Sequence, residues 1–164
     1  MTYDDGASVL QPGEDKTVSF SGTFSGNRVT FVYREPDAAY SIVEWAAAPG
    51  SPGTPPHFHR ATDEGFYVLE GTFGFEVGDQ TFVLRTGAFV FVARGLEHSF
   101  WNEGTTEARL LSTLSPAGFE SYFEELAEGL AAAGDDAQAA TKLRKRLSEK
   151  YDIEVVGPPR QATN

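Results

Sequence analysis

The sequence predicts an all-β barrel or sandwich followed by a short helical extension. Up to about residue 115, apolar and polar residues alternate in short runs that glycine-rich turns separate, which is typical of β-strands. After that point apolar residues recur at helical spacing instead. The 164 residues suffice for one domain, and a hydrophobic fraction of 40% is enough for a buried core.

The strand-like runs follow one another at short spacing. The first two, residues 17–20 and 28–34, predict a hairpin across a glycine-rich connection. The sequence VGDQ at 77–80 predicts a tight turn between two later strands. Many short strands with such turn signals are typical of a sandwich or barrel. The remaining runs are residues 40–46, 65–71, 72–77, 81–85, 89–92, 98–102 and 108–114.

The helical part begins with SPAGFESYFEELAEGL. Ser115 is expected to be the N-cap and Pro116 the first helical residue. A second helix is expected over about 136–151; its basic run KLRKR is interpreted as a solvated helix face, and the final GPPRQATN as a loose tail. The first helix carries its apolar stripe at Phe119, Tyr122, Phe123, Leu126 and Leu130.

Charge and composition exclude several classes of protein. A formal net charge of −11 argues against nucleic-acid binding, which needs clustered Lys and Arg. The absence of Cys excludes disulfides, thiolate metal ligands and a Cys nucleophile. The acidic start MTYDDGASVL does not resemble a signal peptide, and no apolar run is long enough to span a membrane. We therefore expect a cytoplasmic protein without a membrane or nucleic-acid partner.

The chain has only three histidines, and two of them lie close together in PPHFHRATDE at 55–64. His57 and His59 are two residues apart, so on an extended chain both side chains leave the same face. Glu64 and His98 also lie in strand contexts. Three imidazoles and one carboxylate suit Fe, Mn, Co, Ni or Cu, with Zn as a further option. Four protein ligands would leave two positions of an octahedral ion open for catalysis.

The spacing around the first two histidines resembles the first motif of the cupin superfamily, G-x5-H-x-H-x3,4-E-x6-G. His57, His59, Glu64 and Gly71 all fall in register with it. Ser51 stands in place of the leading glycine, which affects the stiffness of a loop and not a metal ligand.

The third histidine lies in a sequence similar to the second cupin motif, G-x5-P-x-G-x2-H-x3-N. Gly87, Gly95, His98 and Asn102 match, and Ala93 replaces the proline. The resemblance implies a cupin double-stranded β-helix, or jelly-roll, barrel with a C-terminal helical extension. We accordingly divide the chain into a barrel with N-terminal strands, residues 1–115, and C-terminal helices with a tail, residues 116–164.

The helical segment after the barrel is similar to that of quercetinase-type dioxygenases. This resemblance implies a flavonol or related aromatic or enol substrate, with O2 as the second substrate and a divalent transition metal as cofactor. His57, His59, Glu64 and His98 would hold the metal, and Glu64 would also be the catalytic base. Resemblance to cupins further implies a homodimer.

Several side chains are candidates for the substrate pocket. The aromatic ones would either contact an aromatic substrate or simply fill the barrel. Asn102 shares a strand face with His98 and would bond either substrate or backbone. The pocket candidates are Trp45, Phe66, Phe75, Phe100 and Asn102.

Two other functions fit the same residues. One is a non-oxidative enzyme, an isomerase or polyketide cyclase, that uses the metal as a Lewis acid. The other is a small-molecule-binding cupin without turnover. The sequence does not choose among these, because one fold supports many activities.

Overall fold

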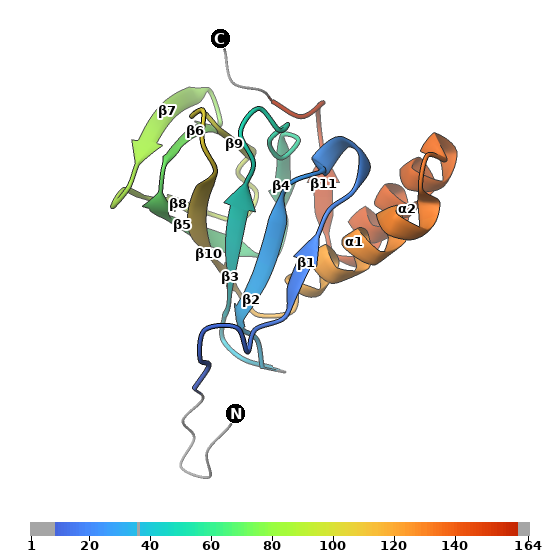
Figure 1. Cartoon of the computed structure of the whole chain (residues 1–164), viewed down its shortest axis with the longest axis horizontal. Helices are drawn as coiled ribbons and strands as arrows, with labels where there is room; N and C mark the ends of the chain where they lie inside the picture. The colour runs from blue at the N-terminus through green and yellow to red at the C-terminus, as the bar shows by residue number, and fades with distance from the viewer. Residues whose placement is uncertain (1–8, 36, 161–164) are drawn as a thin grey trace.

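Two antiparallel β-sheets form the body of the molecule, and two helices lie along one side of it (Figure 1). The computed structural model describes residues 9–35 and 37–160. The elements in chain order are β1 (Thr17–Ser19), η1 (Gly22–Phe24), β2 (Arg28–Tyr33), β3 (Ser41–Ala47), β4 (His57–His59), β5 (Asp63–Glu70), β6 (Thr72–Val77), β7 (Gln80–Arg85), β8 (Phe89–Val92), β9 (His98–Asn102), β10 (Ala108–Ser115), α1 (Ser121–Ala133), α2 (Ala137–Lys150) and β11 (Ile153–Val155).

The strand order is that of a jelly roll. One sheet runs β1-β2-β3-β10-β5-β8 and the other β11-β4-β9-β6-β7. Strands far apart in sequence are therefore neighbours, such as β3 with β10 and β4 with β9. The predicted hairpins β1–β2 and β6–β7 are both present, the second across a two-residue turn. This confirms the predicted all-β jelly-roll barrel with a C-terminal helical extension.

Strand alternation in the larger sheet determines which side chains enter the barrel. Along β10 every second residue is buried, as expected for a strand with one face on the core. Leu114 lies opposite Glu64 of β5, and Leu110 lies opposite Val68. Because β5 alternates in the same register, Glu64 points inward although it is a carboxylate, and its side chain is only 6% exposed.

Two hydrophobic clusters stabilise the fold. The first fills the barrel and contains Phe66, Phe73, Phe75 and Phe100. The second lies between the N-terminal strands and the helices, and includes residues from both, such as Val29, Phe123 and Leu147. Trp45 packs against both clusters. The helices are therefore joined to the strands by a continuous apolar contact.

The first helix begins later than the sequence predicts. Ser115 is still in the β10–β5 ladder opposite Asp63, so it cannot act as the N-cap, and Pro116 is not helical. Residues 116–120 form a turn instead, and α1 begins at Ser121. The carboxylate of Glu120 accepts hydrogen bonds from the Ser41 hydroxyl at 2.8 Å and from a backbone amide in the turn at 2.6 Å.

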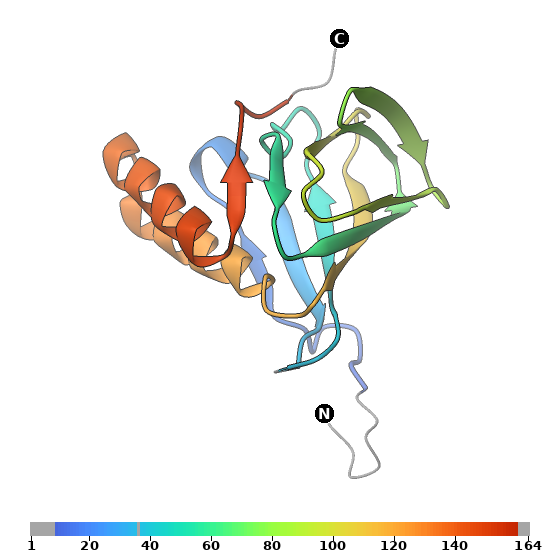
Figure 2. The same ribbon diagram turned by 180° about the vertical axis from the view of Figure 1, so that it is seen from behind.

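The predicted loose tail is wrong over residues 157–160. After α2 the chain forms β11, which the sequence analysis did not predict and which pairs with β4 (Figure 2). Beyond β11, the carbonyl of Arg160 accepts a hydrogen bond from the Gly53 amide at 2.9 Å. The guanidinium of Arg160 pairs with Glu76 at 2.7 Å. These contacts fix the segment against the barrel; residues 161–164 lie outside the described residues.

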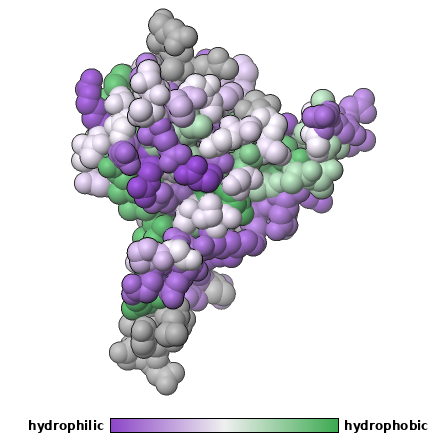
Figure 3. Space-filling model, viewed as in Figure 1, coloured by the Kyte–Doolittle hydropathy of each residue, from purple (hydrophilic) through white to green (hydrophobic). Residues whose placement is uncertain are grey.

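Hydrophilic and hydrophobic residues are unevenly distributed over the surface (Figure 3). On the face seen in Figure 3, hydrophilic residues cover much of the barrel, whereas a band of hydrophobic residues follows the helical arm. None of the helices in residues 9–35 and 37–160 combines the length and the apolar character needed to cross a lipid bilayer.

Candidate metal centre

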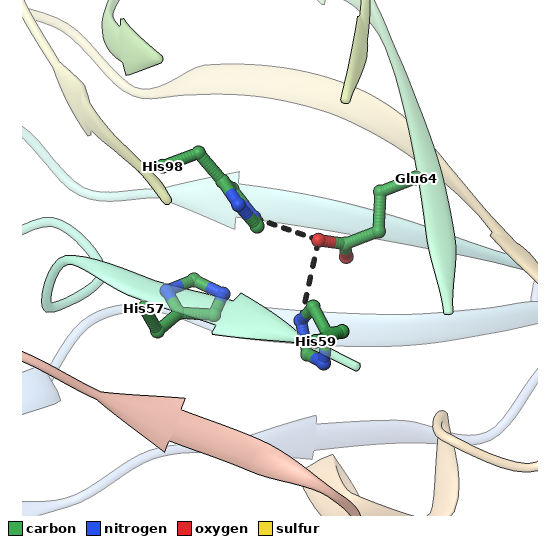
Figure 4. A group of neighbouring side chains, drawn as sticks. All are labelled: His57, His59, Glu64 and His98. Atoms are coloured by element: carbon green, nitrogen blue, oxygen red, sulfur yellow. Dashed lines mark ion pairs between the residues drawn. The ribbon is translucent and has the colours of Figure 1, made fainter. Parts of the chain in front are cut away.

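Three strands bring the histidines and the glutamate together inside the barrel (Figure 4). His57 and His59 both point inward from β4, with one outward residue between them. His98, the first residue of β9, lies directly opposite His57 in the sheet. Glu64 comes from β5 in the other sheet. We call His57, His59, Glu64 and His98 the His/Glu cluster; all four are buried, and one ligand atom from each lies within 4.8 Å of the others.

The carboxylate of Glu64 lies between two imidazoles. Its Oε2 is 2.7 Å from Nε2 of His98 and 3.3 Å from Nε2 of His59. The His57 ring lies beside that of His98, with the ring centroids 4.3 Å apart. The donors of the His/Glu cluster thus face one another from both sheets.

Backbone carbonyls orient two of the rings. Nδ1 of His57 donates to the carbonyl of Pro55 at 2.7 Å, and Nδ1 of His98 donates to the carbonyl of Leu96 at 3.1 Å. A proton on Nδ1 leaves the Nε2 lone pair free to bind a metal. Such a hydrogen bond behind a ligand is the usual way in which proteins set the tautomer and orientation of metal-binding histidines.

The electrostatics of the His/Glu cluster favour a neutral His57 and an ionised Glu64, which are the forms of these two side chains that bind metals. Burial, together with the neighbouring histidines, lowers the pKa of His57 to about 3, so this ring is neutral at pH 7. Burial alone would raise the pKa of Glu64, but the positive charges that His98 and His59 can carry beside it outweigh this effect and lower that pKa. Burial likewise opposes a charge on His98, yet the contact with Glu64 raises the pKa of this imidazole.

The buried donor atoms fit a metal ion. In the part of the chain that the structure describes, Nε2 of His59, Nε2 of His98 and Oε2 of Glu64 approach one another but form no hydrogen bond of regular geometry, and Nδ1 of His59 has no hydrogen-bond partner. Unpaired buried polar atoms are costly and therefore rare in native proteins. A divalent ion at the centre of the His/Glu cluster would satisfy the inward-facing atoms together. Imidazole and carboxylate donors suit first-row transition metals, so the donor set leaves the identity of the metal open.

A cavity of about 540 Å³ leads from the His/Glu cluster to the helices. His57 and Glu64 line its inner end, together with the predicted pocket residues Trp45, Phe66 and Phe100. Its size is in the range of small-molecule sites, which are also mostly apolar with a few polar groups.

Comparison with known proteins agrees with this architecture. Residues 43–114, which include the whole His/Glu cluster, match the family model Cupin_2, described as a cupin domain. The solved structure of an RmlC-like cupin from Shewanella frigidimarina is 25% identical, with a TM-score of 0.57; the match covers 68% of this chain and 93% of that one. Residues 43–114 of this chain are therefore a cupin domain.

Two curated relatives of this cupin come from Streptomyces. Protein SchB of Streptomyces halstedii is 37% identical over 60 residues, which is 37% of this chain and 44% of SchB. Polyketide synthase CurC of Streptomyces cyaneus is 30% identical over 83 residues, or 51% of this chain and 54% of CurC. The chain thus spans about half the length of these relatives. The finer resemblance to quercetinase-type dioxygenases stays a prediction.

The helical extension supplies much of the cavity wall of this cupin. Phe119, Tyr122, Phe123 and Leu126 line the cavity, although the sequence analysis did not assign them to the site. The Phe119 ring meets that of His59 edge to face, with the centroids 4.3 Å apart. The available signal was the aromatic stripe at Phe119, Tyr122 and Phe123. Burial raises the pKa of Tyr122 to about 12, so at neutral pH its phenol is protonated and able to donate a hydrogen bond.

Two of the predicted pocket residues differ from the expectation that they contact a substrate. Asn102 lines the cavity, but its amide nitrogen donates to the carbonyls of Ala47 at 2.9 Å and Thr106 at 2.7 Å. Its oxygen accepts from the backbone of Gly104 at 2.8 Å, so Asn102 bonds the backbone. Phe75 does not line the cavity; it is fully buried in the barrel, where it stacks on Phe100 at 5.5 Å.

Proposed function

We propose that this cupin is a metal-dependent dioxygenase that acts on an enolisable aromatic small molecule of the flavonol or polyketide kind. One observation carries the proposal: the His/Glu cluster lies at the inner end of a mostly apolar cavity of about 540 Å³. A substrate in this cavity would place its polar end at the metal site and its ring system among aromatic side chains.

The donor set fits the chemistry that such a reaction needs. His57, His59, Glu64 and His98 would hold a divalent transition metal. When bound, the metal would supply Lewis acidity towards an enol or catechol-like oxygen pair, and redox chemistry with dioxygen if it is redox-active.

The other side chains bind, orient and protect the substrate. Trp45 meets Phe100 edge to face at 5.5 Å and Phe123 at 5.3 Å, so the barrel and α1 would enclose a flat molecule together. The apolar wall would exclude water, which strengthens electrostatic interactions at the inner end of the cavity. Glu64 would take the enol proton, because its carboxylate is the acidic member of the His/Glu cluster and lines the cavity.

A non-oxidative reaction is the second candidate. The observation that favours it is the similarity to CurC, which is named a polyketide synthase. Poly-β-carbonyl chains chelate divalent metals and cyclise or isomerise through enols, so the same residues would serve an isomerase or cyclase with Lewis-acid chemistry alone. Both candidates share the metal, the base and the class of substrate.

Oxygen consumption separates the two candidates. The purified protein is loaded separately with Fe, Mn, Co, Ni, Cu and Zn, and metal per chain is measured. 3-Hydroxyflavone is then added in a sealed oxygen-electrode cell, and products are identified by mass spectrometry. We expect one O2 consumed per molecule converted with at least one redox-active metal. Conversion of an enolisable polyketide-type substrate without O2 uptake would favour the cyclase; binding without any turnover would overturn both enzymatic proposals.

A pair of neighbouring carboxylates provides the matched variants. Glu64→Gln keeps the size of the side chain but removes its charge, so we expect turnover to fall by about 100-fold or more. Asp63→Asn changes the preceding residue, whose side chain pairs with Arg94 at 2.6 Å instead of joining the His/Glu cluster. Equal loss of activity in both variants would contradict the role of Glu64.

The expected homodimer is also a proposal. Its support is β8, an edge strand of the larger sheet that carries two exposed aromatic residues, Phe89 at 60% and Phe91 at 58%. Exposed apolar groups on a sheet edge are typical of association sites. Size-exclusion chromatography with multi-angle light scattering measures the molar mass of the protein in solution. A monomer at high protein concentration would contradict the proposal.

A further inference from the structure

The outer end of the cavity is lined by cationic side chains that form no ion pair within the described residues. We infer that the substrate of this cupin carries an anionic group, a carboxylate or a phosphate, which Arg144 and Lys145 of α2 bind at the cavity mouth. The inference rests on the proposed function, because it takes the cavity to be the substrate site. The anionic group would lie at the end of the substrate that is remote from its metal-binding oxygens.

Most Lys and Arg side chains of the described residues form ion pairs, and most of those that do not lie on one helix. Eight of the thirteen Lys and Arg residues form an ion pair with a carboxylate of the described residues. Acidic residues outnumber basic ones, at 24 to 13, so partners are abundant. The cations without such a pair are Arg85, Lys142, Arg144, Lys145 and Arg146. Four of the five thus lie on one helix.

The helical period directs two of these four cations into the cavity. Residues three and four apart share a helix face, and the cavity is lined by Thr141, Arg144, Lys145, Ser148 and Glu149 of α2. This places two positive charges, two hydroxyl groups and one carboxylate on one stripe. Lys142 and Arg146 are both exposed and do not line the cavity. The basic run that the sequence presents as a solvated face is therefore divided between solvent and cavity.

The negative groups near the mouth do not cancel this charge. Glu154 lines the cavity beside Arg60, and these two form an ion pair with each other. Glu149 is exposed and also lines the cavity, with no ion pair to a described cation. The stripe of α2 therefore keeps an excess of positive charge.

The surroundings of Arg144 suit an anion. Its guanidinium lies over the ring of Phe24, 5.8 Å from the centroid, and the side chain is only partly exposed. Bonds between a guanidinium or ammonium and an anionic oxygen are about twice as strong as neutral hydrogen bonds. The apolar wall of Phe24 and Tyr122 lowers the local dielectric, which strengthens them further.

Calorimetric titration with matched ligands tests the inference. The metal-loaded protein is titrated with 3-hydroxyflavone, with the same flavonol bearing a 4′-carboxylate, and with the 4′-phosphate. We expect at least one anionic probe to bind about tenfold more tightly than the neutral one, as one charge-assisted contact would give. Preference for the carboxylate or for the phosphate identifies which anion the mouth accepts. Equal affinity for all three probes would overturn the inference while leaving the proposed function intact.

Two double variants control for long-range charge effects. Arg144→Gln with Lys145→Gln should abolish the preference for the anionic probe over the neutral one. Lys142→Gln with Arg146→Gln removes the same charge from the same helix outside the cavity, and the preference should remain. An equal loss of this preference in both double variants would show that the overall positive charge of α2, and not contact inside the cavity, attracts the anion. That result would overturn the inference. If the neutral probe does not bind the unaltered protein either, the proposed function fails instead.

Discussion

The two ends of the cavity are built in opposite ways. At the inner end, three strands from two sheets hold four polar side chains that are buried, and backbone carbonyls orient two of them. At the outer end, the helical hairpin formed by α1 and α2 presents exposed side chains such as Lys145 from a single face of α2. The inner end resists change because its residues lie in sheet ladders and in a close-packed core.

This difference separates the two tasks of a small-molecule site. Chemistry needs donors held to within a fraction of an ångström, which strands provide better than loops or surface helices. Recognition of the remote end of a ligand tolerates longer and more mobile side chains. We infer that in this cupin the barrel holds the reactive centre and the helical hairpin selects the ligand.

The largest effect is expected at the inner end. His98→Ala removes one of the four proposed metal ligands and leaves Glu64 without its 2.7 Å contact. Metal affinity should fall by about 100-fold or more, since even loss of a residue behind a ligand costs 10–100-fold. Metal per chain after dialysis is the measurement. Ser99→Ala, next to it in β9 with a buried hydroxyl outside the His/Glu cluster, should keep its metal. Full metal occupancy in His98→Ala would rule out the His/Glu cluster as the metal site.

The second prediction compares the cores of the two regions. Leu147→Ala, between α2 and the N-terminal strands, and Leu110→Ala, inside the barrel, both truncate a fully buried side chain. Each should lower the free energy of unfolding by about 2–5 kcal/mol, measured by urea denaturation. If Leu147→Ala had almost no effect on the unfolding free energy, the helical hairpin of α1 and α2 would be only loosely packed against the strands. The proposal that this hairpin selects the ligand would then lose support.

The inner end could be predicted from sequence because its signals are local and have fixed spacing. Residues two apart on a strand share a face, so the H-x-H spacing alone was enough to pair His57 with His59. The register of the two motifs then brought in Glu64 and His98, which the structure places beside them. That these four residues bind a metal ion remains a prediction for experiment.

The outer end could not be predicted because it depends on how the hairpin docks. An apolar stripe indicates that a helix face is covered, but not by which surface, so the place of Phe119 and Tyr122 in the cavity was missed. The β4–β11 pairing depends on contact between segments about a hundred residues apart, and short strands carry little signal of their own. Ser115 matched an N-cap pattern, but tertiary pairing with Asp63 prevailed over that local preference.

The third prediction uses one glycine from each region. Gly71, between β5 and β6, has a φ of +81°, and an added Cβ would lie 2.7 Å from Cβ of Ala108. Gly134, after α1, has a φ of +54° with open space around it. Gly71→Ala should cost about 2–3 kcal/mol of unfolding free energy, through strain and a clash, and Gly134→Ala about 1 kcal/mol through strain alone. Thermal unfolding measures the loss of stability in each variant. A larger loss in Gly134→Ala than in Gly71→Ala would show that the turn between β5 and β6 relaxes more easily than the turn after α1.

The smallest effect concerns an ion pair inside the hairpin. Glu125 of α1 pairs with Lys150 of α2, and its Oε1 accepts from the Tyr151 hydroxyl at 2.5 Å. The hydrogen bond from Lys150, with that from Tyr151, lowers the pKa of the Glu125 carboxyl. A lowered pKa stabilises the folded state above the ordinary carboxyl pKa, and this contribution is lost as the pH falls through the folded-state value.

Glu125→Gln should therefore reduce the unfolding free energy at pH 7 by less than about 1 kcal/mol, since the pair is partly screened by solvent. The difference from the unaltered protein should shrink as the pH falls below about 4, near the ordinary pKa of a glutamate. Urea titrations at pH 7 and pH 3.5 measure both quantities. Glu128→Gln, on the exposed side of α1, should show neither effect. A difference for Glu125→Gln that stays constant with pH would mean that the carboxylate acts through packing and not through its charge, and that the two helices are joined by their apolar faces alone.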